Sequence, residues 1–352
     1  MARFSDIIRS KAKRIGAIKP LESVKQEDGV RLSDSWFFKS RNQDTYPAKK
    51  VSTRKTTTPE LSSFYRTFIN RARETGQWAK NDMRISTAPV LTDLHAIIER
   101  DLIDSLYEYA MSVENDNDEI LSHTVDVTFT SLKIGKGMNY DMRMMLRLGL
   151  AAFLENIGMY KIPENILSFD GKWSSDEVQI IRKHPETGYY LLRSLGDRYA
   201  WLAETALSIH ERGDGSGYPS GLKQDEIPEL SAIIGLADSY CAMIRNRSYR
   251  KRFIQTDAVK TIIETDRNKY PSRIVKIFLD QISLFPVNSY VKLNNGSIGR
   301  VFSTNRRHPL SPAVEILYDG EGHKLRDTQQ VFLTDDPLLN IESSIDPEDL
   351  AD

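Results

Sequence analysis

A glycine-rich stretch from His210 to Leu222 reads HERGDGSGYPSGL. It places four glycines around the dipeptide Tyr218-Pro219. Glycine permits backbone conformations that other residues avoid and proline restricts its own φ, so the segment is expected to form a loop that turns sharply. Such a backbone can also approach a ligand closely, although glycine clustering by itself indicates no more than a loop.

The sequence around this loop predicts a helical domain followed by a small β-module. Apolar residues recur at helical spacing from about residue 59 to residue 280. Ser174 with Glu177 forms a capping-box pattern, and Pro228 suits the first turn of a helix. After Pro286 the pattern changes to short apolar runs divided by turn residues. The expected strands are 290–293, 298–302, 314–318 and 331–333, with a turn at Asn294-Asn295-Gly296.

Composition and charge divide the chain into five parts. Residues 1–58 contain fourteen Lys and Arg against six Asp and Glu, which is typical of a flexible basic arm. The expected divisions after it are an N-terminal helical region (59–117), the main helical domain (118–284), the β-module (285–336) and a solvated acidic tail (337–352). Apolar residues in the first eighteen positions recur at near-helical spacing between basic ones. This pattern fits a membrane-surface or partner-binding helix, a helix docked on the protein itself, or a frayed end.

The overall composition excludes several classes of protein. A formal net charge of −1 over 352 residues provides no general attraction to nucleic acid. The single cysteine, Cys241, cannot form an intrachain disulfide, and neither an export signal nor an apolar stretch of membrane-spanning length is visible. The expected location is the cytoplasm, with association to a membrane surface through the N-terminal helix as an alternative.

Five polar side chains are candidates for a metal centre. Glu119 and His123 are four residues apart, so on a helix both project from one face. His184 precedes a proline, and His210 opens the glycine-rich loop. Asp238 interrupts an apolar stretch, where a buried carboxylate without a partner is costly. Such side chains on successive helices can hold a metal ion, although any single histidine is as readily explained as a hydrogen-bonded core or surface residue.

Six ordered motifs resemble those of the HD-GYP family, the cyclic di-GMP phosphodiesterase branch of the HD metal-dependent phosphohydrolases. They are His123 with Val125, the run 154–158 before Ile162-Pro163, the run 183–188, the loop 210–219, Ala237-Asp238 and the run 247–250. The resemblance covers residues 119–284 and implies a helical HD-GYP domain. The following β-module resembles a small SH3-like barrel. The expected fold is therefore mainly α, with a small β-barrel after the helices.

The sequence departs from the family pattern inside the implied metal site. The His-Asp pair of the family falls on Glu155-Asn156, a lysine three residues later falls on Met159, and the first histidine of His-His-Glu falls on Ile209. A second aspartate of the family falls on Cys241. The neutral amide of Asn156 cannot replace a carboxylate that bridges two cations, whereas Glu155 can still donate an oxygen. The ligands that the resemblance retains are Glu119, His123, His184, His210 and Asp238.

These departures favour a protein that has kept the fold and lost the reaction. The chemistry of the family resembles metal-assisted phosphodiester hydrolysis, in which bridging metals lower the pKa of the attacking water toward about 7. Without the bridge, we expect a catalytically inactive nucleotide sensor or protein-interaction module in cyclic di-GMP signalling. The alternative is an active metal-dependent phosphodiesterase with an altered metal site. The expected cofactor is one transition metal ion, iron or manganese, or none.

The resemblance also implies contacts with a ligand and with a partner. Tyr218 offers a stacking face to a nucleotide, and Arg247 and Arg250 fall where the family has cations near the phosphates. Favourable charge at a helix end explains these arginines equally well. Around Tyr218, the residues Gly215, Gly217 and Pro219 complete a loop that is predicted to bind cyclic di-GMP or a signalling protein such as a diguanylate cyclase.

Overall fold

The computed structural model of the chain describes residues 58–113, 119–167, 173–245, 255–264, 266, 268–282, 284–285, 287–305, 308, 310–345 and 350. Nearly all of the predicted basic arm, with its amphipathic helix, lies outside this set, as do Arg247 and Arg250. The expectations for these residues therefore stay predictions. Within the described ranges, no helix is both long and apolar enough to cross a membrane.

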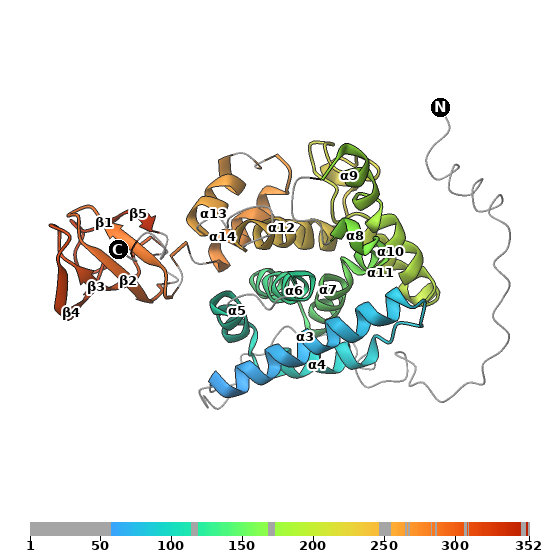
Figure 1. Cartoon of the computed structure of the whole chain (residues 1–352), viewed down its shortest axis with the longest axis horizontal. Coiled ribbons are helices and arrows are strands. Elements are labelled where there is room, and N and C mark those ends of the chain that lie inside the picture. Colours follow the sequence, from blue (N-terminus) through green and yellow to red (C-terminus); the bar gives the residue numbers. More distant parts are fainter. Residues whose placement is uncertain are drawn as a thin grey trace. The chain divides into compact units, whose positions relative to one another are not determined.

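The helical domain runs from α3 (Thr58–Lys80) to α14 (Ser272–Gln281) (Figure 1). The α-helices between them are α4 (Ala88–Glu99), α5 (Ile103–Ser112), α6 (Glu119–Gly137), α7 (Met142–Leu154), α8 (Glu164–Leu167), α9 (Ser175–Ile181), α10 (His184–Arg193), α11 (Ala200–Leu207), α12 (Glu229–Ile244) and α13 (Gln255–Glu264). The described residues also form the short 3₁₀ helices η1 (Ile157–Lys161), η2 (Asp197–Tyr199) and η3 (Gln224–Glu226). The predicted helical character of this region is confirmed.

Several helices begin where the sequence provides a cap. The predicted capping box is present at α9, where Ser174 and Glu177 each bind the other's backbone N–H. The carboxylate of Asp141 accepts a hydrogen bond from the backbone N–H of Met144 at 2.7 Å and so caps α7. Pro228 is the N-cap of α12. Local chemistry therefore accounts for these three boundaries.

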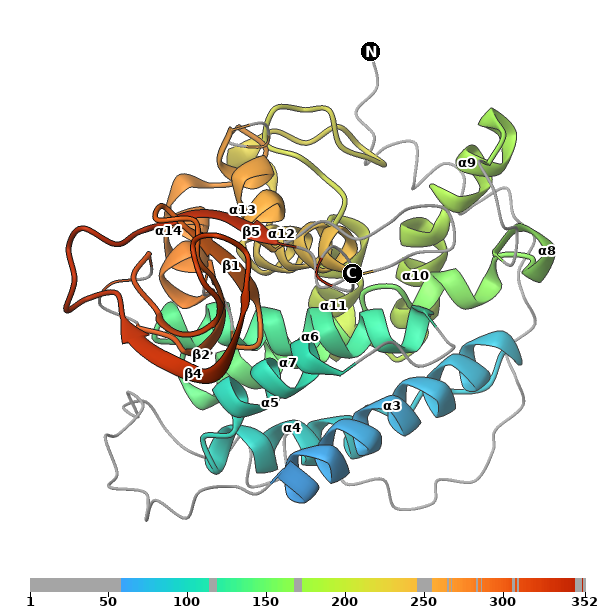
Figure 2. The ribbon, with the colours of Figure 1, turned by 60° about the vertical axis from the view of Figure 1, so that its left-hand side comes forward.

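Helix α6 is the centre of the helical domain. It lies between α12 and α3 (Figures 1 and 2) and also contacts α5, α7 and α14. Every residue from Leu121 to Gly135 is buried except His123, which is partly exposed. Phe129 packs edge-on against Phe68 of α3, with ring centroids 5.1 Å apart. Each fully buried side chain of this size contributes about 1.5–3 kcal/mol, so α6 holds the surrounding helices together.

A buried ion pair joins the end of α12 to α5 and α6. The guanidinium of Arg245 donates to both carboxylate oxygens of Asp126, at 2.8 and 3.1 Å, and to the backbone carbonyls of Val113 and Ala110. Asp126 is fully buried. Burial raises the pKa of Asp126, and the charge of Arg245 offsets only part of this effect. The pair is satisfied by hydrogen bonds on both sides, as a buried charge requires.

The β-module is an open antiparallel sheet. Its strands are β1 (Tyr290–Leu293), β2 (Ile298–Ser303), β3 (Ala313–Tyr318), β4 (Lys324–Phe332) and β5 (Ile341–Ile345), in the order β4-β3-β2-β1-β5. The module and its antiparallel strands were expected. The predicted barrel is not closed, because β4 and β5 remain edge strands of the described sheet. The turn between β1 and β2 is confirmed, and Gly296 there has a φ of +85°, which glycine adopts without strain.

The predicted acidic tail contains a strand. Ser344 of β5 pairs with Val291 of β1. The backbone N–H of Asn294 donates to the carbonyl of Asn340 at 3.0 Å, and the backbone N–H of Asn340 donates to Oδ1 of Asn294 at 3.1 Å. Lys292 also lies 3.3 Å from the carboxylate of Glu342. The β-module therefore extends beyond residue 336, to at least Ile345. The strand could not be predicted from charge composition, because it forms by pairing with backbone N–H and C=O groups of β1 that would otherwise be unsatisfied.

Candidate functional site

Side chains from five separate segments meet in one cluster of the helical domain. His123 comes from α6, Glu155 from the end of α7, His184 from the first turn of α10, His210 from the segment after α11, and Asp238 from α12. Four of these five are metal ligands predicted from the sequence. The tertiary structure therefore brings together residues that are up to 115 positions apart along the chain.

Asp238 lies between two histidines. Its Oδ1 is 2.9 Å from Nε2 of His123, and its Oδ2 is 3.6 Å from Nδ1 of His210. Burial would raise the pKa of Asp238, but interactions that include the hydrogen bond with His123 and the nearby positive charge of Arg212 outweigh this effect and lower it. The carboxyl group is therefore ionised at neutral pH. Its contacts with the two histidines explain how an acid is tolerated in the apolar α12.

A second contact within the cluster joins the rings of His184 and His210. Nε2 of His184 lies 2.8 Å from Nε2 of His210. The backbone carbonyl of Ile181 lies 2.8 Å from Nδ1 of His184, so Nδ1 carries the proton and, in the neutral ring, Nε2 offers its lone pair. Burial lowers the pKa of both rings, and that of His210 falls to about 3. Both rings are thus held in the neutral form that binds metals.

Glu155 belongs to the cluster. Ligand atoms of His123, Glu155 and Asp238 all lie within 4.8 Å of one another. The sequence placed Glu155 among the altered positions of the family pattern, with the provision that it can still donate an oxygen. The neighbouring Asn156 donates a hydrogen bond from Nδ2 to Oε1 of Glu155 at 2.8 Å. The amide of Asn156 therefore supports the carboxylate of Glu155.

The remaining candidates from the sequence lie elsewhere or play another part. Glu119 is exposed in the first turn of α6 and is not a member of the group formed by His123, Glu155 and Asp238. Met159 lies partly exposed in η1. Ile209 is 1 % exposed and directly precedes His210. An apolar side chain thus occupies the position next to a metal-ligand candidate.

Two glycines allow the backbone segments of the cluster to approach closely. A Cβ atom on Gly158 of η1 would lie 2.0 Å from the carbonyl oxygen of His184. A Cβ atom on Gly235 of α12 would lie 2.4 Å from the carbonyl oxygen of Ile209. Asp238 follows Gly235 by about one helical turn. The first close approach therefore sets the distance between η1 and the backbone of His184, and the second sets the distance between α12, which carries Asp238, and the segment of His210.

The glycine-rich loop is held from inside by Glu211. This residue is 3 % exposed, and its two carboxylate oxygens accept hydrogen bonds from the backbone N–H groups of Ser220 at 2.6 Å and Leu222 at 2.9 Å. Near the start of the loop, Asp214 accepts a hydrogen bond from the backbone N–H of Ser216 at 2.9 Å. The loop is therefore an ordered segment with its own internal hydrogen bonds.

Tyr218 packs against the cluster instead of standing at an exposed apex. Its ring is parallel to that of His210, with an interplanar angle of 9° and centroids 5.0 Å apart. The guanidinium of Arg182 lies 5.2 Å from the centroid of the same ring. Burial raises the pKa of Tyr218 to about 12, so its hydroxyl stays protonated. Arg182 was not predicted from the sequence, because an exposed arginine two positions before a histidine has the pattern of any solvated residue.

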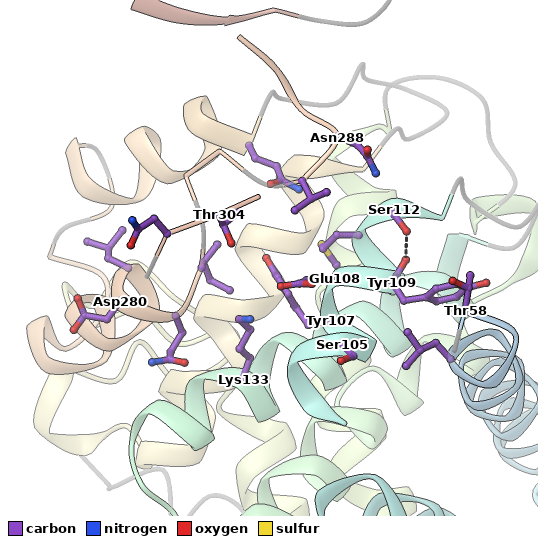
Figure 3. A pocket seen from close by; sticks show the side chains of 18 residues that line it. Thr58, Ser105, Tyr107, Glu108, Tyr109, Ser112, Lys133, Asp280, Asn288 and Thr304 are labelled. Carbon is purple, nitrogen blue, oxygen red and sulfur yellow. Dashed lines mark hydrogen bonds between the residues drawn. The ribbon is translucent and has the colours of Figure 1, made fainter. Parts of the chain in front are cut away.

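A separate pocket of about 420 Å³ is lined by none of the metal-ligand candidates. Figure 3 shows its wall in the helical domain, where Ser105, Tyr107 and Glu108 of α5 face Lys133 of α6. The ammonium of Lys133 lies 4.6 Å from the centroid of the Tyr107 ring and 3.0 Å from a carboxylate oxygen of Asp104. Ten residues of α6, about 15 Å of helix, separate Lys133 from His123.

Comparison with known proteins identifies both parts of the chain. Residues 109–274 match the family model of the HD domain, and residues 290–352 match that of the KOW domain associated with HD domains. A cyclic di-GMP phosphodiesterase of Pseudomonas aeruginosa is 29 % identical over 209 residues, which cover 59 % of this chain and 50 % of the relative. A cyclic di-GMP phosphodiesterase of Thermotoga maritima is 35 % identical over 158 residues, covering 45 % and 43 %.

The helical domain matches an HD domain and resembles the HD-GYP family. A solved structure of an HDG"Y"P protein from Bdellovibrio bacteriovorus has the same fold, with a TM-score of 0.52 and 18 % identity, covering 65 % of this chain and 73 % of that one. The chain spans about half the length of the curated relatives it matches. The helical domain contains a candidate metal-binding group, and its donor set of imidazoles and carboxylates fits a transition metal.

Proposed function

We propose that the HD-GYP domain binds cyclic di-GMP at a one-metal centre and hydrolyses it no faster than background. Similarity to cyclic di-GMP phosphodiesterases supports the choice of ligand class. The observation that carries the proposal is the hydrogen bond from Nδ2 of Asn156 to Glu155. This bond directs the neutral amide of Asn156 toward the cluster, at the position where the family resemblance implies a carboxylate that bridges two cations.

The donor set supports one metal ion, iron or manganese. His123, Glu155 and Asp238 supply an imidazole and two carboxylates within 4.8 Å of one another, and His184 and His210 add neutral imidazoles nearby. When bound, the ion would neutralise the two carboxylates and polarise a phosphate of the ligand. The second imidazole that a two-metal site would use is replaced by the apolar Ile209.

Three replacements argue against efficient hydrolysis. The amide of Asn156 carries no charge with which to bridge two cations, and the thioether of Met159 carries no charge to offer a phosphate. Ile209 is buried and cannot coordinate a metal. Each replacement removes a charge or a donor from the reaction centre, so binding is expected to survive where turnover does not.

An active phosphodiesterase with an altered metal site is the second candidate function. The inclusion of Glu155 in the cluster favours it, because this carboxylate brings back a negative charge next to the missing aspartate. Under this alternative, a single metal and the remaining donors would be enough for turnover.

Metal analysis together with turnover measurements tests the proposal. The purified chain would be reconstituted without oxygen with iron or manganese, its metal content measured, and cyclic di-GMP titrated by calorimetry and followed by chromatography. We expect no more than one ion per chain, saturable binding and background hydrolysis. Two tightly bound ions per chain would overturn the one-metal proposal, and robust turnover that is lost in His184→Ala would establish the alternative.

A rescue experiment sharpens the test. The triple change Glu155→His, Asn156→Asp and Ile209→His restores the donors that the family pattern contains, and it is expected to raise hydrolysis above background. Asn156→Asp alone is expected to leave hydrolysis unchanged, because the second imidazole is still missing. Ile209 is buried, so the thermal stability of the triple variant must be measured to show that it has folded.

The glycine-rich loop is proposed as the second contact surface of the domain. Asp214, Ser216 and Ser220 are exposed on it, whereas Tyr218 is partly buried. A partner such as a diguanylate cyclase would therefore contact the exposed polar residues rather than the tyrosine ring. Loss of partner binding on Ser216→Arg, with unchanged binding of cyclic di-GMP, would support this role. Unchanged partner binding would remove the loop from the interface.

A further inference from the structure

A cationic side chain, that of Arg182, lies near the metal-ligand cluster. It contacts the ring of Tyr218, which stacks on the ring of His210. Arg182 follows the last residue of α9, and its guanidinium carbon is 5.2 Å from the centroid of the Tyr218 ring. The Tyr218 ring is in turn stacked on His210, whose Nδ1 is 3.6 Å from Asp238. The side chain of Arg182 is exposed, so its donors are open to solvent.

The charge of Arg182 has no acidic partner among the described residues. Two other basic residues of the domain have such partners: Lys161 lies 2.6 Å from a carboxylate oxygen of Asp82, and Arg193 lies 3.2 Å from one of Asp197. No described carboxylate lies within ion-pair distance of Arg182. Its guanidinium therefore keeps its hydrogen-bond donors available while the Tyr218 ring fixes its position.

Arg212, a second arginine close to the cluster, cannot take this part. Its guanidinium donates to the backbone carbonyls of Ile209 and Glu211, both at 2.9 Å, and to the hydroxyl of Ser239 at 3.0 Å. These three bonds hold Arg212 as a structural link between the loop and α12. Arg182, which lies over the Tyr218 ring that stacks on His210, therefore keeps donors of the kind that Arg212 uses within the protein.

We infer that Arg182 is a phosphate-binding residue of the HD-GYP site and that Tyr218 is its positioning residue. The inference rests on the proposed function, since it names the cation that receives a phosphate of cyclic di-GMP. A guanidinium matches the oxygens of a phosphate through parallel hydrogen bonds, which an ammonium cannot reproduce. Arg182 also provides a positive charge that Met159 does not.

The stacking changes the role of the tyrosine. Both His210 and Arg182 lie over the Tyr218 ring, so these contacts leave little of it for a nucleotide base. The ring instead orients a cation toward the ligand and packs against a metal-ligand candidate. Binding of the phosphate is therefore expected to depend on Arg182, with Tyr218 acting through it.

The test compares two arginines that stack on tyrosines. Arg198 lies 4.9 Å from the centroid of the Tyr199 ring, is exposed, and belongs to η2 rather than to the cluster. Arg198→Ala is therefore the matched control for Arg182→Ala, because each removes one exposed guanidinium from one tyrosine ring. The metal-loaded full chain would be titrated with cyclic di-GMP at constant salt, and metal content and Tm would be measured for each variant.

We expect Arg182→Ala to weaken the binding of cyclic di-GMP about ten- to a hundredfold, the usual effect of losing a hydrogen bond to a charged group. Arg182→Lys should bind with intermediate affinity, because it keeps the charge and loses the paired geometry. Arg198→Ala should bind like the unmodified protein, and all three variants should keep its metal content and Tm. A purely structural Arg182 would instead lower Tm or metal content.

The outcomes separate the inference from the function on which it rests. If the unmodified chain does not bind cyclic di-GMP, the proposed function fails and the inference fails with it. If the unmodified chain binds and Arg182→Ala binds equally well, or no worse than Arg198→Ala, only the inference is overturned. A loss confined to Arg182→Ala, partly recovered in Arg182→Lys, supports both.

Discussion

The carboxylate of Glu211 is expected to determine whether the glycine-rich loop keeps its shape. It is 3 % exposed and accepts hydrogen bonds from two backbone N–H groups of that loop, at 2.6 and 2.9 Å. Each hydrogen bond to a charged group contributes about 1.5–3 kcal/mol. Glu211→Gln keeps one acceptor oxygen, weakens its bond by removing the charge, and turns an amide N–H₂ toward the second backbone donor. We therefore expect a loss of about 2–4 kcal/mol in the free energy of unfolding.

Thermal and urea denaturation would measure this loss. For a domain of this size, about 2–4 °C of Tm corresponds to each kcal/mol, so Glu211→Gln should lower Tm by roughly 5–15 °C. The matched control is Glu226→Gln, whose exposed carboxylate accepts a single hydrogen bond from the backbone N–H of Lys223 at 2.9 Å. The control should change stability by about 0.5 kcal/mol or less.

Binding adds a second measurement for the same variant. The Tyr218 ring stacks on His210, and the backbone N–H of Tyr218 donates to the carbonyl of His210 at 3.1 Å. A loosened loop should therefore weaken metal binding as well as stability. The reasoning would be refuted if Glu211→Gln matched Glu226→Gln in Tm and retained its metal affinity, since the loop would then keep its shape without the buried charge.

Three further predictions concern packing and charge. Tyr218→Ala should destabilise the chain by about 1–3 kcal/mol in urea denaturation, because a partly buried ring that stacks on His210 is removed, whereas Tyr218→Phe should be nearly neutral. Asp126→Asn should cost about 3–5 kcal/mol, because it leaves the charge of Arg245 buried without its partner, and an unchanged midpoint would contradict this. Burial would raise the pKa of Asp104, but the charges of two lysines outweigh it and lower the folded-state pKa below 3.8. The stability from Asp104 is therefore fully present above its unfolded pKa and is lost as the pH falls below it, so Asp104→Asn should flatten the pH dependence of unfolding in acid.

Local sequence was sufficient for the elements whose cause is local. The capping box of Ser174 and Glu177 starts α9, Pro228 precedes α12, and Gly296 makes the turn between β1 and β2. These boundaries depend on hydrogen bonds and backbone angles within a few residues, so a sequence pattern contains the necessary information. The strand β4 was predicted only at its end, because its other residues are largely exposed and show no clear alternation.

The cluster was predictable in kind but not in membership. His123, His184, His210 and Asp238 stood out because polar side chains interrupt helical patterns or adjoin a loop of recognised sequence. Glu119 precedes His123 by one helical turn, yet it remains exposed and outside the group that contains Glu155. Helical spacing fixes which side chains share a face, whereas the distance to another helix depends on packing.

The succession of helices, the β-module and the chemical character of the candidate metal site follow from sequence patterns alone. The tertiary structure alone decided that Glu155 joins His123 and Asp238, that Tyr218 stacks on His210 beneath Arg182, and that β5 completes the sheet. The physical reason is the range of the interactions. Caps, turns and periodicity act between residues a few positions apart, whereas close approaches such as that of Gly235 to the backbone of Ile209 exist only after distant helices have packed.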